Sequence, residues 1–233
     1  MRSFLGILVV IAAMAVTPAG AVFAHGGGSS GSSGMVTATP RSGADAAKSA
    51  YNAGVRNIKK AQDYDADAAK ASTPEKAAKA HDKAQKAYHD SLASFIDAVG
   101  ADPKMYQAWN YLGFANRHLG NYEDALSSYA KALEINPNYP DAIEYRGEAY
   151  LGLNQIEEAK GAYMALFSSS RPLADELMVA MHHWADARRQ DSQGLPSADV
   201  EAFTKWMDER ASVAAQTASL AIGAVQPWSA GLH

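Results

Sequence analysis

The chain is 233 residues long and 48% of its residues are apolar, which is ordinary for a soluble globular protein of one domain with or without tails. Its formal net charge of -4, with no block rich in Lys and Arg, excludes the strongly basic class of nucleic-acid-binding domains. Alanine is abundant and β-branched residues are sparse over the middle of the chain, which favours helices.

The first 24 residues have the layout of a secretory signal peptide. Arg2 precedes an apolar run from Phe4 to Val16, and Pro18 and small residues follow. The small residues allow cleavage at two places, before His25 or after Ala21. Because the apolar run is shorter than the ~20 residues that span a bilayer, we expect export and cleavage. An uncleaved membrane anchor is the alternative.

The absence of cysteine indicates where such an exported chain would reside. Without cysteine the chain can form neither a disulfide nor a lipid-modified cysteine, whereas secreted eukaryotic proteins of this size more often carry disulfides. We therefore expect a bacterial protein, periplasmic or secreted, with no stable membrane insertion after signal cleavage. Residues 25–43 are rich in Gly and Ser and predict a flexible linker, and residues 223–233 predict a loose tail.

The centre of the chain is similar to itself at an offset of 34 residues. The aligned pairs include Trp109 with Ile143, Gly113 with Gly147, Leu119 with Leu153, Ala125 with Ala159 and Tyr129 with Tyr163. Within one period the order is an aromatic residue, a Leu-Gly pair, a glycine turn and a proline near the end. This pattern resembles the tetratricopeptide repeat, a helix–turn–helix unit of 34 residues. The resemblance covers residues 106–139 closely and 140–173 more loosely. The alternative is one helical hairpin whose alanines coincide by chance.

The small residues of this pattern have a packing role. Two helices approach closely only where one side chain is small, as at Gly113 and Ala125, and Pro137 ends the second helix because proline cannot continue one. Residues 44–105 predict an elongated helical hairpin with a degenerate repeat, in which Thr73 caps the second helix. Residues 174–222 predict C-terminal capping helices. We thus expect an all-α fold, a short tetratricopeptide-type helical solenoid.

The resemblance implies a protein-binding scaffold or adaptor whose first helices line a concave groove. Its groove positions, carried onto this chain, are Gln107, Asn110, Phe114, Arg117, His118, Asp141, Glu144, Tyr145 and Glu148. These positions hold one arginine and several acids, so the basic carboxylate clamp of chaperone-binding relatives is absent. We expect instead a protein or peptide segment that carries a Lys or Arg and is anchored against Phe114 and Tyr145. The alternative is that these side chains are merely exposed.

No catalytic motif stands out, and we expect a protein that is not an enzyme and needs no cofactor. His182 and His183 are adjacent, so on a helix they point about 100° apart and do not naturally share one metal ion. Cleavage before His25 would create a histidine N-terminus that could chelate copper, although glycines follow at once. A metal-handling accessory protein or enzyme using these histidines is the alternative function, and a passive structural subunit is a third.

Overall fold

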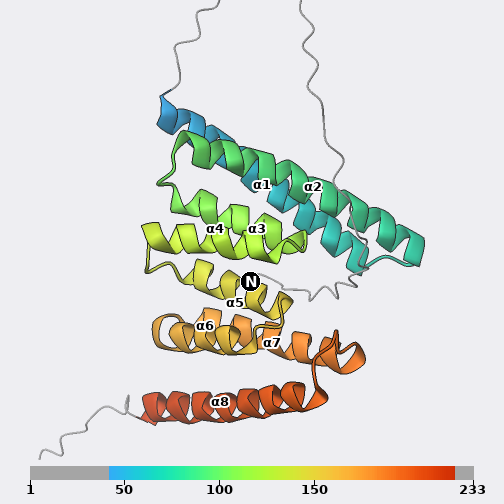
Figure 1. Cartoon of the computed structure of the whole chain (residues 1–233), viewed down its shortest axis with the longest axis vertical. Coiled ribbons are helices and arrows are strands. Elements are labelled where there is room, and N and C mark those ends of the chain that lie inside the picture. The colour runs from blue at the N-terminus through green and yellow to red at the C-terminus, as the bar shows by residue number, and fades with distance from the viewer. Residues whose placement is uncertain (1–41, 224–233) are drawn as a thin grey trace, which may run out of the picture.

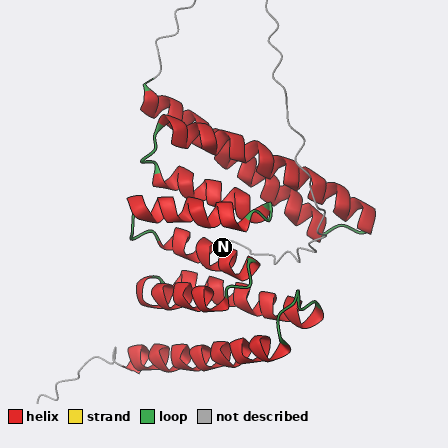
Figure 2. Cartoon of the chain, viewed as in Figure 1, coloured by secondary structure: helices red, strands yellow, loops and turns green. Residues whose placement is uncertain are grey.

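The computed structural model describes residues 42–223, and describes the side chains of the last helix as far as residue 217. Every regular element in this part of the chain is a helix (Figures 1 and 2). The helices are α1 (Gly43–Ala69), α2 (Pro74–Ala101), α3 (Tyr106–His118), α4 (Tyr122–Ile135), α5 (Pro140–Gly152), α6 (Ile156–Ser169), α7 (Arg171–Gln190) and α8 (Ser197–Gly223). The predicted all-α fold is confirmed.

The helices stack one after another along the chain (Figure 1). Each helix packs on its neighbours in sequence, and α1, α3, α5 and α7 also contact one another in turn. We call these four helices the first layer. Such packing of each unit on the next is what makes a solenoid, and it places side chains from successive first-layer helices beside each other.

Glycines set the closest contacts between helices. A Cβ atom added at Gly113 on α3 would lie 2.6 Å from the ring of Tyr129 on α4, and one added at Gly147 on α5 would lie 2.7 Å from Leu177 on α7. Both distances are far below van der Waals contact. The small residue at Gly113, predicted from the sequence to be a packing contact, therefore lets the aromatic ring of the next helix lie against the backbone.

The elongated hairpin of α1 and α2 contains the same kind of contact. A Cβ atom at Gly54 on α1 would lie 2.6 Å from the ring of Phe95 on α2. This pair reproduces Gly113 and Tyr129, so α1 serves as the first helix of the degenerate repeat. The 34-residue offset misses it, because 41 positions separate Gly54 from Phe95 and only 16 separate Gly113 from Tyr129. Both hairpin helices extend beyond α3 and α4 (Figure 1).

Local signals and the C-terminal core fix the ends of the stack. The Thr73 hydroxyl accepts a hydrogen bond from the Lys76 amide, which caps α2 as the sequence predicts. At the other end, α8 is held by Phe203 and Met207, which are fully buried against α6 and α7 residues of one core cluster.

Arg146, which replaces a leucine of the repeat pattern, is half-buried with its guanidinium over the Tyr150 ring.

Several sequence expectations lie outside the described residues. They are the signal peptide with its cleavage sites, His25, most of the linker and the last residues of the tail. Within the described part of the chain, none of the helices combines the length and apolar character that crossing a membrane requires.

Candidate partner-binding face

The residues predicted to bind a partner come together on two neighbouring helices of the first layer. We call this region the α3–α5 face. It consists of Gln107, Asn110, Phe114, Arg117 and His118 on α3, and of Asp141, Glu144, Tyr145 and Glu148 on α5. Asn110 and Glu144 occupy equivalent positions on the two helices, because each lies three residues before a glycine that packs against another helix.

Arg117 joins the two helices of the face. Its Nη1 forms an ion pair with Glu148 Oε2, and its guanidinium lies 5.3 Å from the Phe114 ring centre and 5.5 Å from that of Tyr145. The pair is mostly shielded from solvent, with side chains 13% and 24% exposed. This combination of ion pair and cation–π contacts fixes the guanidinium plane between α3 and α5. Arg117 Nε is sealed from solvent and has no hydrogen-bond partner.

The expectation of an open groove at these positions requires correction. Asn110, Phe114 and Glu144 are only 1%, 5% and 3% exposed. The Phe114 ring packs edge-to-face on Tyr145, with centroids 5.0 Å apart, and lies 4.4 Å from the His118 ring. Phe114 is therefore a core residue rather than an open anchor. The reason is that α2 and α5 both press on this part of α3.

Asn110 carries a buried polar atom without a partner. Its Nδ2 donates a hydrogen bond to the Tyr139 hydroxyl at 3.4 Å, whereas its Oδ1 is sealed from solvent and accepts no hydrogen bond. A buried acceptor without a donor costs ~1–3 kcal/mol. Native proteins leave few such groups, so each one calls for a physical explanation.

Glu144 is a second residue of the face whose acceptors have no partner among the described residues, and it lies one repeat further along. Among the described residues it makes no hydrogen bond and no ion pair. Burial raises the pKa of its carboxyl group to about 7; the nearby Arg117 guanidinium opposes the rise, while Glu176 and Asp141 add to it. The carboxylate oxygens are not among the polar atoms sealed from solvent. The residual exposed surface of Glu144 thus includes a group able to accept a hydrogen bond from outside.

His118 belongs to the supporting core of the face. Its ring stacks on Tyr88 of α2 at 4.6 Å, and burial together with the Arg117 guanidinium holds its pKa well below the ordinary value. The imidazole is neutral at pH 7. It contributes packing, and no positive charge, to the α3–α5 face.

Glu176 was missed as a neighbour of the face. It lies on α7, which the sequence analysis assigned to the C-terminal cap. The sequence does indicate that α7 resembles α5, since the 34-residue offset aligns Asp175 with Asp141 and Leu177 with Ile143. In the structure α7 packs on α5 as the next first-layer helix does, and this brings Glu176 toward Glu144.

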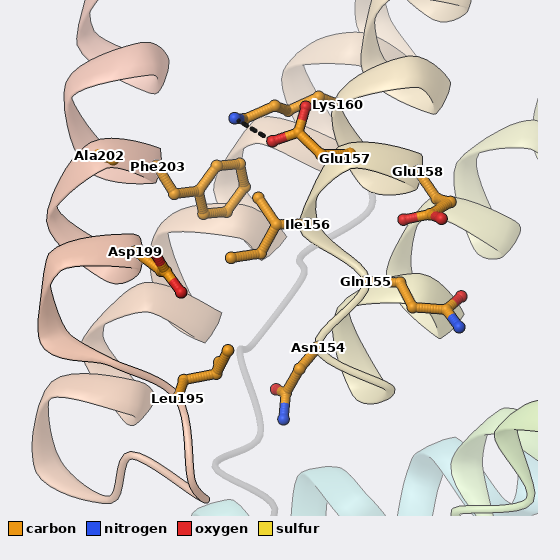
Figure 3. A pocket seen from close by; sticks show the side chains of 10 residues that line it. All are labelled: Asn154, Gln155, Ile156, Glu157, Glu158, Lys160, Leu195, Asp199, Ala202 and Phe203. Atoms are coloured by element: carbon orange, nitrogen blue, oxygen red, sulfur yellow. Dashed lines mark hydrogen bonds and ion pairs between the residues drawn. The ribbon is translucent and has the colours of Figure 1, made fainter.

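A separate cleft of about 380 Å³ lies between the start of α6 and the start of α8 (Figure 3). Three of its polar side chains already have partners: Lys160 pairs with Glu157 at 2.7 Å, and Asn154 Oδ1 accepts from Arg188 Nε at 2.8 Å. The Lys160 amine also lies over the rings of Phe203 and Trp206. These contacts make the cleft a joint between the second repeat and the cap.

The histidine pair considered for metal binding lies on α7. His182 is half-buried and His183 is exposed. Within residues 42–223, no group of three or more His, Cys, Asp or Glu side chains is placed to hold a metal ion. His25 lies outside the described residues, so its copper chemistry stays a hypothesis.

Comparison with known proteins fits this architecture. Residues 106–139 match the profile of the tetratricopeptide repeat, and residues 128–161 match a second profile of the same description. Residues 106–161 are therefore similar to tetratricopeptide repeats. The first match covers the helices α3 and α4, and the second runs from within α4 into α6, so the α3–α5 face lies within the repeat array.

Similarity beyond the repeats is low. Among solved structures, the chain is similar to the first TPR of Spaghetti (RPAP3) bound to the HSP90 peptide SRMEEVD, with 20% sequence identity and a TM-score of 0.36. That alignment covers 61% of this chain and 93% of the other. Comparison with curated proteins found no match.

Proposed function

We propose that this protein is an exported scaffold or adaptor, periplasmic or secreted in a bacterium, that holds a peptide segment of a partner protein on its α3–α5 face. Tetratricopeptide arrays are protein-interaction modules, and residues 106–161 are similar to such repeats. Because a fold alone does not determine a function, the proposal also needs support from the side chains of a site.

The supporting observation is the set of buried polar atoms without partners on the α3–α5 face. Asn110 Oδ1 and Arg117 Nε are sealed from solvent and make no hydrogen bond. An extended peptide offers backbone N–H and C=O groups along its length, which are the donors and acceptors that these two atoms lack. Pairing these groups on binding would recover free energy that the free protein lacks.

Affinity capture from the native envelope, followed by mass spectrometry, tests this proposal when it is run with two matched variants. Asp141→Arg reverses a charge on the face, in the first turn of α5. The control variant Glu123→Arg reverses an exposed charge in the first turn of α4, away from the face. Both variants place a positive charge near a helix N-terminus, so both should have a similar unfavourable interaction with the helix dipole. We expect the same partner from wild type and Glu123→Arg, and its loss from Asp141→Arg. Equal capture by both variants would place the binding site elsewhere.

A further inference from the structure

The Glu144 carboxylate is an unusual group within the described part of the chain. Glu144 is 3% exposed, yet no described residue donates a hydrogen bond to it or pairs with it. Buried carboxylates are ordinarily hydrogen-bonded or paired with a cation, because desolvation of an unpaired charge is costly. Its oxygens are nevertheless not sealed from solvent. The described part of the protein therefore supplies no donor to this carboxylate, and a donor can approach it from outside.

The surroundings of Glu144 indicate the charge of the missing donor. Asp141, one turn earlier on α5, and Glu176 on α7 both act electrostatically on Glu144 and disfavour its ionised form. Arg117 is the cation that opposes them, but its guanidinium is committed to the ion pair with Glu148. Acids from two helices thus act on the carboxylate, and neither of them forms an ion pair with a cation among the described residues. This field attracts a positive group and repels a carboxylate or phosphate.

We propose that the α3–α5 face takes a positively charged Lys or Arg side chain of the partner peptide, whose ammonium or guanidinium group donates to the Glu144 carboxylate between Asp141 and Glu176. The inference rests on the proposed function and adds the chemistry of the ligand. It needs two independent features together, a buried carboxylate without a partner and an acidic rim around it. A hydrogen bond between two charged groups is stronger than one between neutral groups, so this contact would carry much of the specificity.

Small probes test the charge preference without knowledge of the partner. The full-length protein at pH 8 is titrated with N-acetyl-arginine amide, N-acetyl-lysine amide and N-acetyl-citrulline amide, and backbone amide shifts are followed by NMR. Citrulline has nearly the shape of arginine but no charge. We expect saturable shifts on α5 and α7 with the arginine or lysine probe, and at least tenfold weaker binding of the citrulline probe. The stronger of the two cationic probes identifies the preferred head group.

Two variants assign the binding to Glu144. Glu144→Gln keeps the shape of the side chain and removes its charge, while Glu123→Gln removes a charge from an exposed acid on α4. We expect Glu144→Gln to weaken binding of the cationic probes at least tenfold and Glu123→Gln to leave it unchanged. Unchanged binding to Glu144→Gln, or equal binding of citrulline and arginine probes, would overturn the inference. Circular dichroism verifies that both variants are folded.

The inference and the proposed function can fail separately. If Asp141→Arg abolishes capture of the partner but the cationic probes do not bind, the face binds a peptide whose recognition does not depend on a positive side chain. If the probes bind through Glu144 but the partner is captured equally by Asp141→Arg, the cation site exists and the proposed function is wrong.

Discussion

Three helices of the first layer carry different types of side chain at one equivalent position. The residue three places before the packing glycine is Tyr51 on α1, Asn110 on α3 and Glu144 on α5. The backbone presents each of them in the same way, but their neighbours differ. Tyr51 contacts other aromatic rings, whereas Asn110 and Glu144 retain acceptors without donors. The fold thus repeats while the chemistry of its face changes from one unit to the next.

The buried carboxylate of Glu144 makes the stability of the fold depend on pH. Its pKa is about 7 in the folded protein and near 4.5 in an unfolded chain, so the folded state binds the proton more tightly. Stability therefore falls as pH rises from about 4.5 to 7, and the full cost remains above pH 7. The shift corresponds to roughly 3 kcal/mol.

Glu144→Gln removes this cost, because glutamine resembles the protonated acid. We expect the variant to melt several degrees above wild type at pH 8 and above it by a clearly smaller margin at pH 5, where only a small part of the cost is present. Thermal unfolding followed by circular dichroism at the two pH values measures the difference. An equal effect of the substitution at both pH values would show that Glu144 does not titrate between them.

Phe114 contributes to stability rather than to an open binding surface. Its ring is enclosed by Tyr145, His118 and Tyr88, so Phe114→Ala should leave a cavity and cost about 3–5 kcal/mol. Urea unfolding of this variant beside Ile96→Ala, which truncates a side chain that is 56% exposed, provides the comparison. A loss for Phe114→Ala no larger than that for Ile96→Ala would mean that the ring is not part of the core.

At the scale of the elements, glycine contacts define how each helix pair closes. A Cβ atom added at Gly113 would lie 2.6 Å from the ring of Tyr129. A Cβ atom added at Gly161, in the middle of α6, would meet no neighbouring atom within 4 Å. The same substitution should consequently have opposite effects at the two positions. The difference depends on packing alone, since both glycines are helical.

Gly113→Ala should destabilise the protein by roughly 1–3 kcal/mol, because the buried Tyr129 ring must shift. Gly161→Ala should stabilise it by about 0.5–1 kcal/mol, because alanine is the better helix former and meets no neighbour. Denaturant unfolding of the two variants measures both changes. A neutral or stabilising effect of Gly113→Ala would contradict the close contact between α3 and α4.

The sequence predicts the elements of this fold better than the environment of its site. Periodic glycines, alanines and closing prolines report local packing, so the helices of the central repeats can be inferred from spacing. The role of α1 could not be inferred, because the lengthened hairpin moves Gly54 out of the 34-residue register. The sequence also named Phe114 and Glu144 as face residues but not their burial. That burial depends on how α2, α5 and α7 press together, which spacing along one chain does not encode.

At the scale of the whole molecule, each helix contacts only near neighbours of the stack within the described residues. Such an array needs no distant segment to fold, so we expect the N-terminal leader to be dispensable for the structure. The export hypothesis then makes a direct prediction about the mature chain. Its intact mass should correspond to a chain that begins at His25, or at Val22 if the alternative site is used. A product that retains Phe4 to Val16 would indicate a membrane-anchored protein.

The long hairpin at the start of the stack forms an arm that projects beyond the neighbouring unit (Figure 1). Gly54 and Phe95 hold α1 and α2 to each other where α3 joins the stack, and α1 runs on for fifteen residues past that glycine, compared with five for α3 past Gly113. At about 1.5 Å per residue, the additional length carries the hairpin tip roughly two to three helical turns beyond the neighbouring unit. Because the contact between Gly54 and Phe95 lies away from the tip, whole turns could be added to or removed from both helices together without disturbing the stack. The reach of the arm can therefore evolve, or be engineered, independently of the array that supports it.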